Sequence, residues 1–589
     1  MYRRLALLLL LALVPLISQT TPGQEIQRHS NSAPAPSPSP TIDPAVEKKA
    51  LDLLESISDQ SAKFNSAANR IRASAAIADL LWRRDENRAR ALFKGAITQL
   101  ATHIAETDFG DVERYQEISR FHELRQNLVM RIAAHDPELA LTALRQTRLP
   151  GTVTHQWLPQ QESNLELTLA NFIVAKNPEL ALKIARASLS RGVTWNLTSL
   201  LSQLAQKDVK SAQGFYGEIV ARLKSEDLGK NSDPANYALH LLSSFQPPQA
   251  DEQTFRDLFT MVLSSLFSLN RETQSGINMA QNFYHQLDGL MPLVEKYAAS
   301  RTTDLRTWMR TVERTLDPGM QMYKELSRLS QTASLDDILA LAEKQPSEFK
   351  TMAYQHAAGK ALTSGDVTRA KEIIEMIPDL FQRRQMLDQL EAHNARNLKG
   401  DDQLTSARAL IEKARTVTRK VELIAQIANS LAANNKKTEA LELLNDGKIL
   451  VTATPSSAEQ VKAQLRLAQA YAALDPDQAF AIVQPLIIRL NELLAAAAVL
   501  DGIDFRYLKD GEWEMPGVNN LGMIVSRLNQ ILTVLGRIDF DRALSFVAQI
   551  DRPEIRIMIQ IDIAQVVLTG GSADQRFNGP TMLRSHIMN

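Results

Sequence analysis

One spacing recurs along this chain and limits what it can fold into: a small or apolar residue, a larger apolar residue three positions later, and an alanine eight positions after that. An aspartate or asparagine stands four residues before each of six such alanines, at Asp85, Asp136, Asn177, Asp208, Asp475 and Asp539. These residues cap helices, because the side-chain oxygen accepts a hydrogen bond from a backbone N–H of the first turn. Proline follows three of them, at Pro137, Pro178 and Pro476, where a helix needs no N–H. The spacing therefore predicts a repeated unit of one helix, a short turn and a second, capped helix.

The remaining pattern is helical as well. From about residue 45 onward apolar residues recur at steps of three and four, as in 75–82 and 423–428, with little alternation of the period typical of strands. Two further units carry a longer turn, at Gly365 and Asn435. Such hairpins cannot bury their apolar faces alone and must stack on neighbours. We predict an all-α fold, an α-α superhelix (solenoid) of irregular helix-turn-helix repeats.

Some of these units resemble a known repeat family. The stretch from Ala463 to Tyr471, followed by Ala479, is similar to the tetratricopeptide repeat in its small, large and alanine positions. The successive alanines are unevenly spaced, however, unlike the 34-residue period of a tetratricopeptide array. The resemblance covers about half of the chain and extends to α-solenoid repeats in general. It implies a fold and does not specify a ligand.

The N-terminal region is typical of an exported protein. Arg3 and Arg4 precede an apolar run from Leu5 to Ile17, too short for a membrane span but suited to a signal peptide. The alternative is an uncleaved N-terminal anchor. No later segment is expected to span a membrane. We predict a periplasmic or secreted protein with this organisation: signal peptide 1–20, disordered Pro/Ser-rich linker 21–45, N-terminal repeats 46–225, middle helical segment 226–335, C-terminal repeats 336–570 with an insertion near 502–520, and flexible tail 571–589.

Two insertions interrupt the repeats and carry aromatic residues. The first, 149–159, contains Trp157. The second, 505–516, contains Tyr507 and Trp513 on either side of Asp510-Gly511, a pair that favours a two-residue hairpin turn. Insertions in solenoids often contact partners, so these three aromatics are the candidate interaction residues. The alternative, which the pattern favours, is a lid whose aromatics cover an open end of the core.

Composition excludes several classes of chemistry. The chain has no cysteine, which excludes disulfides, thiolate metal sites and cysteine nucleophiles. Its 66 Lys+Arg and 67 Asp+Glu give a formal charge of −1, without the basic surplus of a nucleic-acid-binding protein. The histidines lack the spacing of helical metal ligands, and no nucleophile-elbow, phosphate-loop or dinucleotide motif is present. We therefore assign no catalytic residue, cofactor or metal.

These observations favour a non-catalytic scaffold that binds a protein or peptide partner. Two alternatives remain open. One is a cell-envelope polysaccharide-acting enzyme with its site in the superhelix groove, which paired carboxylates and aromatics in a concave face would favour. The other is a structural envelope assembly factor. An apolar or mixed groove without acids of shifted pKa would favour protein or peptide recognition.

Overall fold

The structure is a computed structural model of the 589-residue chain. It describes residues 43–107, 115–150, 158–269, 273–316, 326, 334–396, 403–452, 454–503, 506–513 and 520–570. The predicted signal peptide, nearly all of the predicted linker, Trp157 and the predicted tail lie outside these residues. They stay predictions.

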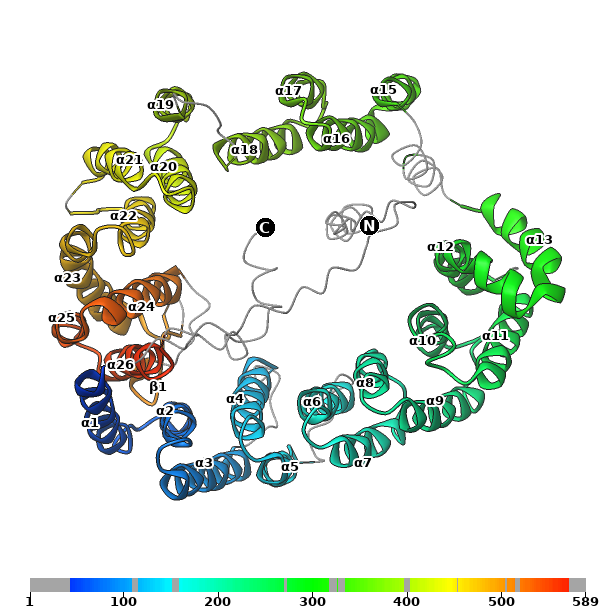
Figure 1. Ribbon diagram of the computed structural model, residues 1–589, viewed down its shortest axis with the longest axis horizontal. Helices are drawn as coiled ribbons and strands as arrows, with labels where there is room; N and C mark the ends of the chain where they lie inside the picture. The colour runs from blue at the N-terminus through cyan, green and yellow to red at the C-terminus, as the bar shows by residue number, and fades with distance from the viewer. Residues whose placement is uncertain are drawn as a thin grey trace, which may run out of the picture. The chain divides into compact units, whose positions relative to one another are not determined.

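The regular secondary structure of the described residues is almost entirely helical, which confirms the predicted all-α class (Figure 1). The first half contains α1 (Pro44–Ser61), α2 (Ala67–Leu81), α3 (Glu86–Glu106), α4 (Tyr115–Ala133), α5 (Pro137–Gln146), α6 (Leu158–Ile173), α7 (Pro178–Leu189), α8 (Asn196–Ala205), α9 (Val209–Lys224), α10 (Ser232–Ser244), α11 (Glu252–Phe267), α12 (Gln274–Tyr297), the 3₁₀ helix η4 (Ala299–Arg301) and α13 (Thr302–Glu313). The second half contains α15 (Leu335–Lys344), α16 (Ser347–Thr363), α17 (Val367–Glu375), α18 (Leu380–Arg396), α19 (Gln403–Glu412), α20 (Val417–Ala433), α21 (Lys437–Leu450), α22 (Ala458–Tyr471), α23 (Pro476–Leu500), the strands β1 (Leu508–Lys509) and β2 (Glu512–Trp513), α24 (Asn520–Ile538), α25 (Phe540–Val547) and α26 (Pro553–Leu568).

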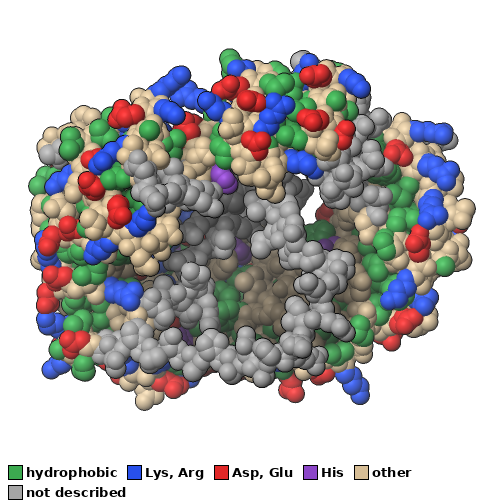
Figure 2. All heavy atoms as spheres, turned by 45° about the horizontal axis from the view of Figure 1, so that its top comes forward, with side chains coloured by type: hydrophobic (Ala, Val, Ile, Leu, Met, Phe, Trp, Pro, Cys, Tyr) green, Lys and Arg blue, Asp and Glu red, His purple; other side chains and the backbone are tan. Residues whose placement is uncertain are grey.

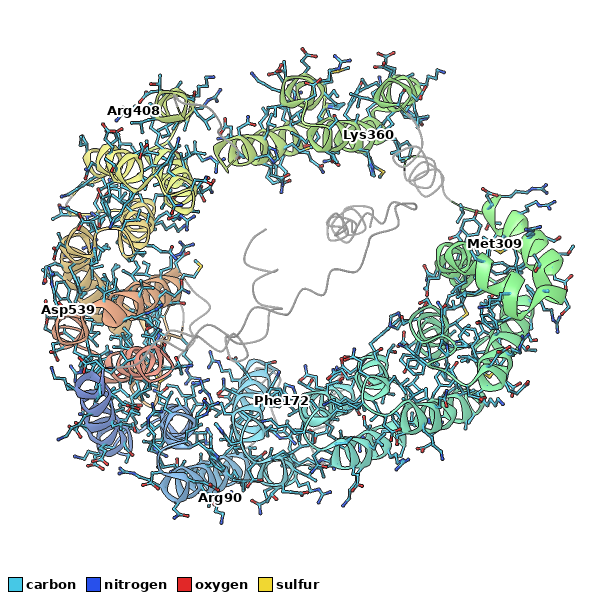
Figure 3. The ribbon with its side chains drawn as sticks, in the orientation of Figure 1. Arg90, Phe172, Met309, Lys360, Arg408 and Asp539 are labelled. Carbon is cyan, nitrogen blue, oxygen red and sulfur yellow. The ribbon has the colours of Figure 1, made fainter. Side chains whose placement is uncertain are left out.

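The six Asp and Asn residues of the repeat spacing stand at helix N-termini. Each side chain accepts a backbone N–H of the following first turn, at donor–acceptor distances of 2.9 Å for Asp136 and 3.2 Å for Asp475. Asp539, labelled in Figure 3, caps α25 through the N–H of Arg542 at 3.0 Å. The alanines four residues after the caps are fully buried: Ala89, Ala140, Ala181, Ala212, Ala479 and Ala543. A small side chain at this position lets neighbouring helices approach closely.

The two longer turns use left-handed backbone. Gly365 has φ 83° between α16 and α17, and Asn435 has φ 62° between α20 and α21. Glycine and asparagine adopt this conformation more readily than other residues, which is why they end helices there.

Helices pack against their nearest and second-nearest neighbours in the chain. α2 contacts α3 and α4, and the series continues from α4 to α6 and from α6 to α8. In the second half α18, α20, α22, α24 and α26 contact one another in the same order. Each unit thus buries its apolar face against the next unit. On the face shown in Figure 2, Lys and Arg side chains are interspersed with Asp and Glu.

The packing also joins segments far apart in the sequence. One hydrophobic core includes buried residues of 50–316 and of 407–568, and a second, smaller core lies within 326–390. The first and last described segments meet because α26 packs against α1 and α2 (Figure 1). The Arg84 side chain binds Glu47 at 2.6 Å and donates to the backbone oxygen of Leu568 at 3.1 Å.

Asp136 allows a test of one cap. Its carboxylate accepts the Leu139 N–H and pairs with Arg90 of α3, a residue that is labelled in Figure 3. Burial raises the pKa of Asp136, but the Leu139 N–H and Arg90 lower it by more, so the pKa lies below its ordinary value. Asp136 therefore stabilises the fold at neutral pH, and this contribution is lost as the pH falls from the ordinary aspartate value of 3.8 through the folded-state pKa.

We expect Asp136→Ala to destabilise the α4–α5 unit by about 1 kcal/mol or somewhat more at neutral pH, through loss of the cap and of the Arg90 pair. Hydrogen–deuterium exchange of the α5 amides measures this locally. Asp136→Asn is the matched control, because it keeps the capping oxygen and removes only the charge. Unchanged exchange in Asp136→Ala would contradict the capping role.

Candidate functional site

The predicted hairpin is present in the second insertion. β1 pairs antiparallel with β2, with Leu508 opposite Trp513 and Lys509 opposite Glu512. Asp510 and Gly511 form its turn with φ of 54° and 79°, as a two-residue turn with two left-handed residues requires. The hairpin is fixed to the end of α23, because Asp501 accepts the backbone N–H groups of Tyr507 and Leu508 at 2.6 and 2.8 Å.

Glu512 attaches this hairpin to the start of α2. Its carboxylate accepts the backbone N–H groups of Asn65 and Ser66 at 2.6 and 3.2 Å, and the Asn69 amide at 3.2 Å. Asn69 also donates to the backbone oxygen of Trp513 at 3.0 Å. A carboxylate is favourable here because the N-terminus of a helix carries a partial positive charge. The hairpin therefore connects the C-terminal part of the large core, within 407–568, to its N-terminal part, within 50–316.

The structure describes two of the three candidate aromatic residues, and these two differ in burial. Trp513 is 1% exposed and packs in the core, while its backbone N–H donates to Glu554 of α26 at 2.7 Å. Its ring is therefore not available to a partner. This is the arrangement that the alternative of a lid over the core describes. Tyr507 stacks on Trp513 with ring centroids 6.2 Å apart and is half-buried. Trp157 lies outside the described residues.

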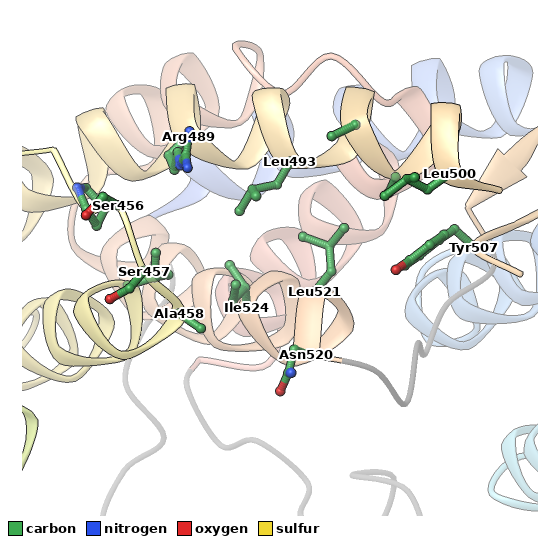
Figure 4. A pocket seen from close by; sticks show the side chains of 14 residues that line it. Ser456, Ser457, Ala458, Arg489, Leu493, Leu500, Tyr507, Asn520, Leu521 and Ile524 are labelled. Atoms are coloured by element: carbon green, nitrogen blue, oxygen red, sulfur yellow. The ribbon is translucent and has the colours of Figure 1, made fainter. Parts of the chain in front are cut away.

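Tyr507 lines a groove between α22, α23 and α24 (Figure 4). The cavity has a volume of about 470 Å³. Its walls are mainly aliphatic, with Leu493 and Leu500 on α23 facing Leu521 and Ile524 on α24 (Figure 4). The rim is polar, and its residues are Ser456, Ser457, Arg489 and Asn520.

Helix α23 carries more apolar surface than the core buries. Pro476–Leu500 is long and apolar enough to cross a membrane by length and composition, with a mean hydropathy of 1.5 in its most apolar window. The expectation that no segment after the signal peptide spans a membrane stays a prediction, because length and composition alone do not place a helix in a membrane. Only 39% of the window is buried. Ile488 and Val499 are 55% and 76% exposed.

The groove has a polar rim, and its described lining residues include no carboxyl group and no histidine. Arg489 is the charged residue among them, and it pairs with Glu492 at 2.6 Å. In the described part of the chain no group of three His, Asp or Glu side chains could hold a metal ion. Burial raises the pKa of Asp562, but this carboxyl accepts the Asn529 amide at 2.6 Å and does not line the groove.

The groove residues Leu493, Leu521 and Ile524 are not among the site residues predicted from the sequence. They lie on two helices separated by the hairpin insertion, and each helix by itself has an ordinary apolar periodicity. One signal was present: the apolar residues of 476–500 are too numerous for a single buried helix face.

A scan against protein-family models and a search of the curated proteins find no match to this chain. The similarity to tetratricopeptide repeats therefore remains one of residue spacing.

Proposed function

We propose that the protein is an exported α-solenoid scaffold that binds an amphipathic helix of a partner protein in the groove between α23 and α24. The observation that carries the proposal is the lining of the groove: aliphatic walls, a polar rim and no carboxylate among the described lining residues. Protein-binding sites commonly combine an apolar centre with a polar edge.

The shape of the groove favours a helix as the ligand. Its two walls are themselves helices, and an amphipathic helix can lay its apolar residues at positions i, i+3, i+4 and i+7 into such a groove. Val499, which directly precedes the lining residue Leu500 in the chain, is exposed and adds apolar surface beside the cavity. Arg489 on the rim is complementary to an acidic residue on the polar side of the ligand helix.

The polysaccharide-acting alternative has less support at this groove. Glycoside hydrolysis commonly uses two carboxyl groups about 5–10 Å apart on either side of the scissile bond. The described lining contains one aromatic residue, Tyr507, and no carboxyl group.

Selection from a display library of amphipathic helical peptides tests the proposal on the full chain. We expect selected peptides to share aliphatic residues at helical spacing and to bind with micromolar or tighter affinity by fluorescence anisotropy. Leu493→Glu should weaken this binding at least tenfold, because it places a charge in the apolar wall.

Ile488→Glu is the matched control, since Ile488 lies on the same helix, is exposed and is not a lining residue. Equal loss of binding in both variants would count against the groove. Failure to select any helical peptide, together with cleavage of a cell-wall polysaccharide, would favour the enzyme alternative.

Export is a separate part of the proposal and rests on residues 1–20. Fractionation of cells that express the tagged full chain should place it outside the cytoplasm. Replacement of Arg3 and Arg4 by glutamate should retain it inside, because a signal peptide needs a positive N-terminal region.

A further inference from the structure

A second cavity lies between α5, α6 and α7, far along the chain from the groove. Its volume is about 320 Å³. Its ionic lining consists of four cationic residues and two carboxylates: Arg145, Arg148, Lys183, Arg191, Glu162 and Glu166. The cations outnumber the carboxylates by two, although the whole chain carries almost no net charge.

The two carboxylates are already occupied by arginines. Glu162 accepts from Arg125 at 2.9 Å and from Arg148 at 3.1 Å. Glu166 accepts from Arg148 at 2.9 Å and also pairs with Arg191. The Glu162 pKa lies below its ordinary value: burial raises it, but Arg125 and Arg148 lower it by more, so this residue stays ionised at neutral pH.

These contacts hold two arginines in place while leaving donors unused. Arg148 donates through Nε and one terminal nitrogen, and Arg191 does the same toward Ser163 and Glu166. The second terminal nitrogen of each has no hydrogen-bond partner among the described residues. Arg145 and Lys183 are exposed and form no ion pair with any described residue. The cavity therefore combines two arginines that are held in place with two cations that no described carboxylate neutralises.

We propose that this cavity binds an oxyanion, the phosphate or carboxylate group of a small ligand. The remaining terminal nitrogen of Arg148 and of Arg191 can donate a charge-assisted hydrogen bond to a phosphate or carboxylate oxygen, and Lys183 adds a point charge. The glutamates orient the arginines and do not neutralise the remaining cations. The volume suits a small molecule or a single acidic side chain and not a polymer. The site does not depend on the groove between α23 and α24, so either proposal can fail without the other.

Isothermal titration of the full chain with inorganic phosphate, with citrate and with a short glutamate-rich peptide, at constant ionic strength, tests the proposal. We expect saturable one-to-one binding of at least one probe with millimolar or tighter affinity. The probe that binds most tightly shows whether phosphate, a free carboxylate ligand or an acidic peptide is the source of the anion. Affinity should fall as salt concentration rises.

The double variant Arg145→Gln/Lys183→Gln should weaken binding at least tenfold and leave the fold intact, because neither side chain holds another described residue. Lys207→Gln/Lys210→Gln removes the same charge near the start of α9, outside the cavity, and should leave binding unchanged. Saturable binding that survives the first variant, equal weakening in both variants, or no binding of any probe would each overturn the proposal.

Discussion

Replacement of Glu162 by alanine is expected to lower the free energy of unfolding by about 3–5 kcal/mol, because it leaves a buried guanidinium without its carboxylate. The Arg125 side chain is only 2% exposed and forms a two-pronged contact with Glu162. Its other partners are the Thr147 hydroxyl at 3.0 Å and the backbone oxygen of Leu144. Neither partner carries a charge to replace the lost one.

Urea unfolding of the full chain, combined with hydrogen exchange of α4, α5 and α6, measures this loss. Glu218→Ala is the matched control: Glu218 also pairs with an arginine, Arg186, but both side chains are substantially exposed, at 39% and 55%. An exposed pair contributes about 0–1 kcal/mol. Similar losses in the two variants would contradict a special role for the buried pair. Arg125→Met together with Glu162→Leu should recover much of the stability, because it removes both charges.

Replacement of Trp513 by alanine should cost about 3–5 kcal/mol, the usual range for emptying a buried aromatic site. Trp513 lies where β2, α26 and the start of α2 meet, so the loss should fall on the contact between the two ends of the large core. Hydrogen exchange should therefore rise in α1, α2 and α26 more than in α6 to α9. Unfolding in urea gives the total change.

Trp513→Phe separates ring packing from hydrogen bonding. The Trp513 indole Nε1–H is buried and has no hydrogen-bond partner among the described residues, so phenylalanine removes an unpaired donor while keeping an aromatic ring. We expect a loss well below that of alanine. If both substitutions cost the same, or if alanine costs less than about 1 kcal/mol, Trp513 does not hold the two ends together.

The amount of structure that could be predicted from the sequence differs between local and long-range features. The spacing of Asp136 and Ala140 predicted a cap and a buried close contact, and Asp510-Gly511 predicted a hairpin turn. Nothing in the sequence paired Glu512 with Asn65, because 447 residues separate them. The groove was missed for the same reason, since its walls belong to separate helices.

The two aromatic residues of the hairpin show most clearly what could not be predicted from the sequence. In the sequence Tyr507 and Trp513 are equivalent: each flanks the same turn, and each is as suited to a binding surface as to a core. The structure places Trp513 in the core and Tyr507 at the groove. Trp513 is the more buried of the two because α26 and the start of α2 pack against it, and the sequence of the hairpin does not specify those contacts.

The sequence by itself determined the all-α class and the six helix caps, because a cap depends on a hydrogen bond between residues two or three positions apart. Only the tertiary structure decided that α26 and the hairpin pack against α1 and α2, that Glu162 neutralises Arg125, and that an apolar groove remains beside α23. Those outcomes depend on shape complementarity and charge pairing between distant segments. Such interactions form only when packing brings the segments together, and no local pattern records them.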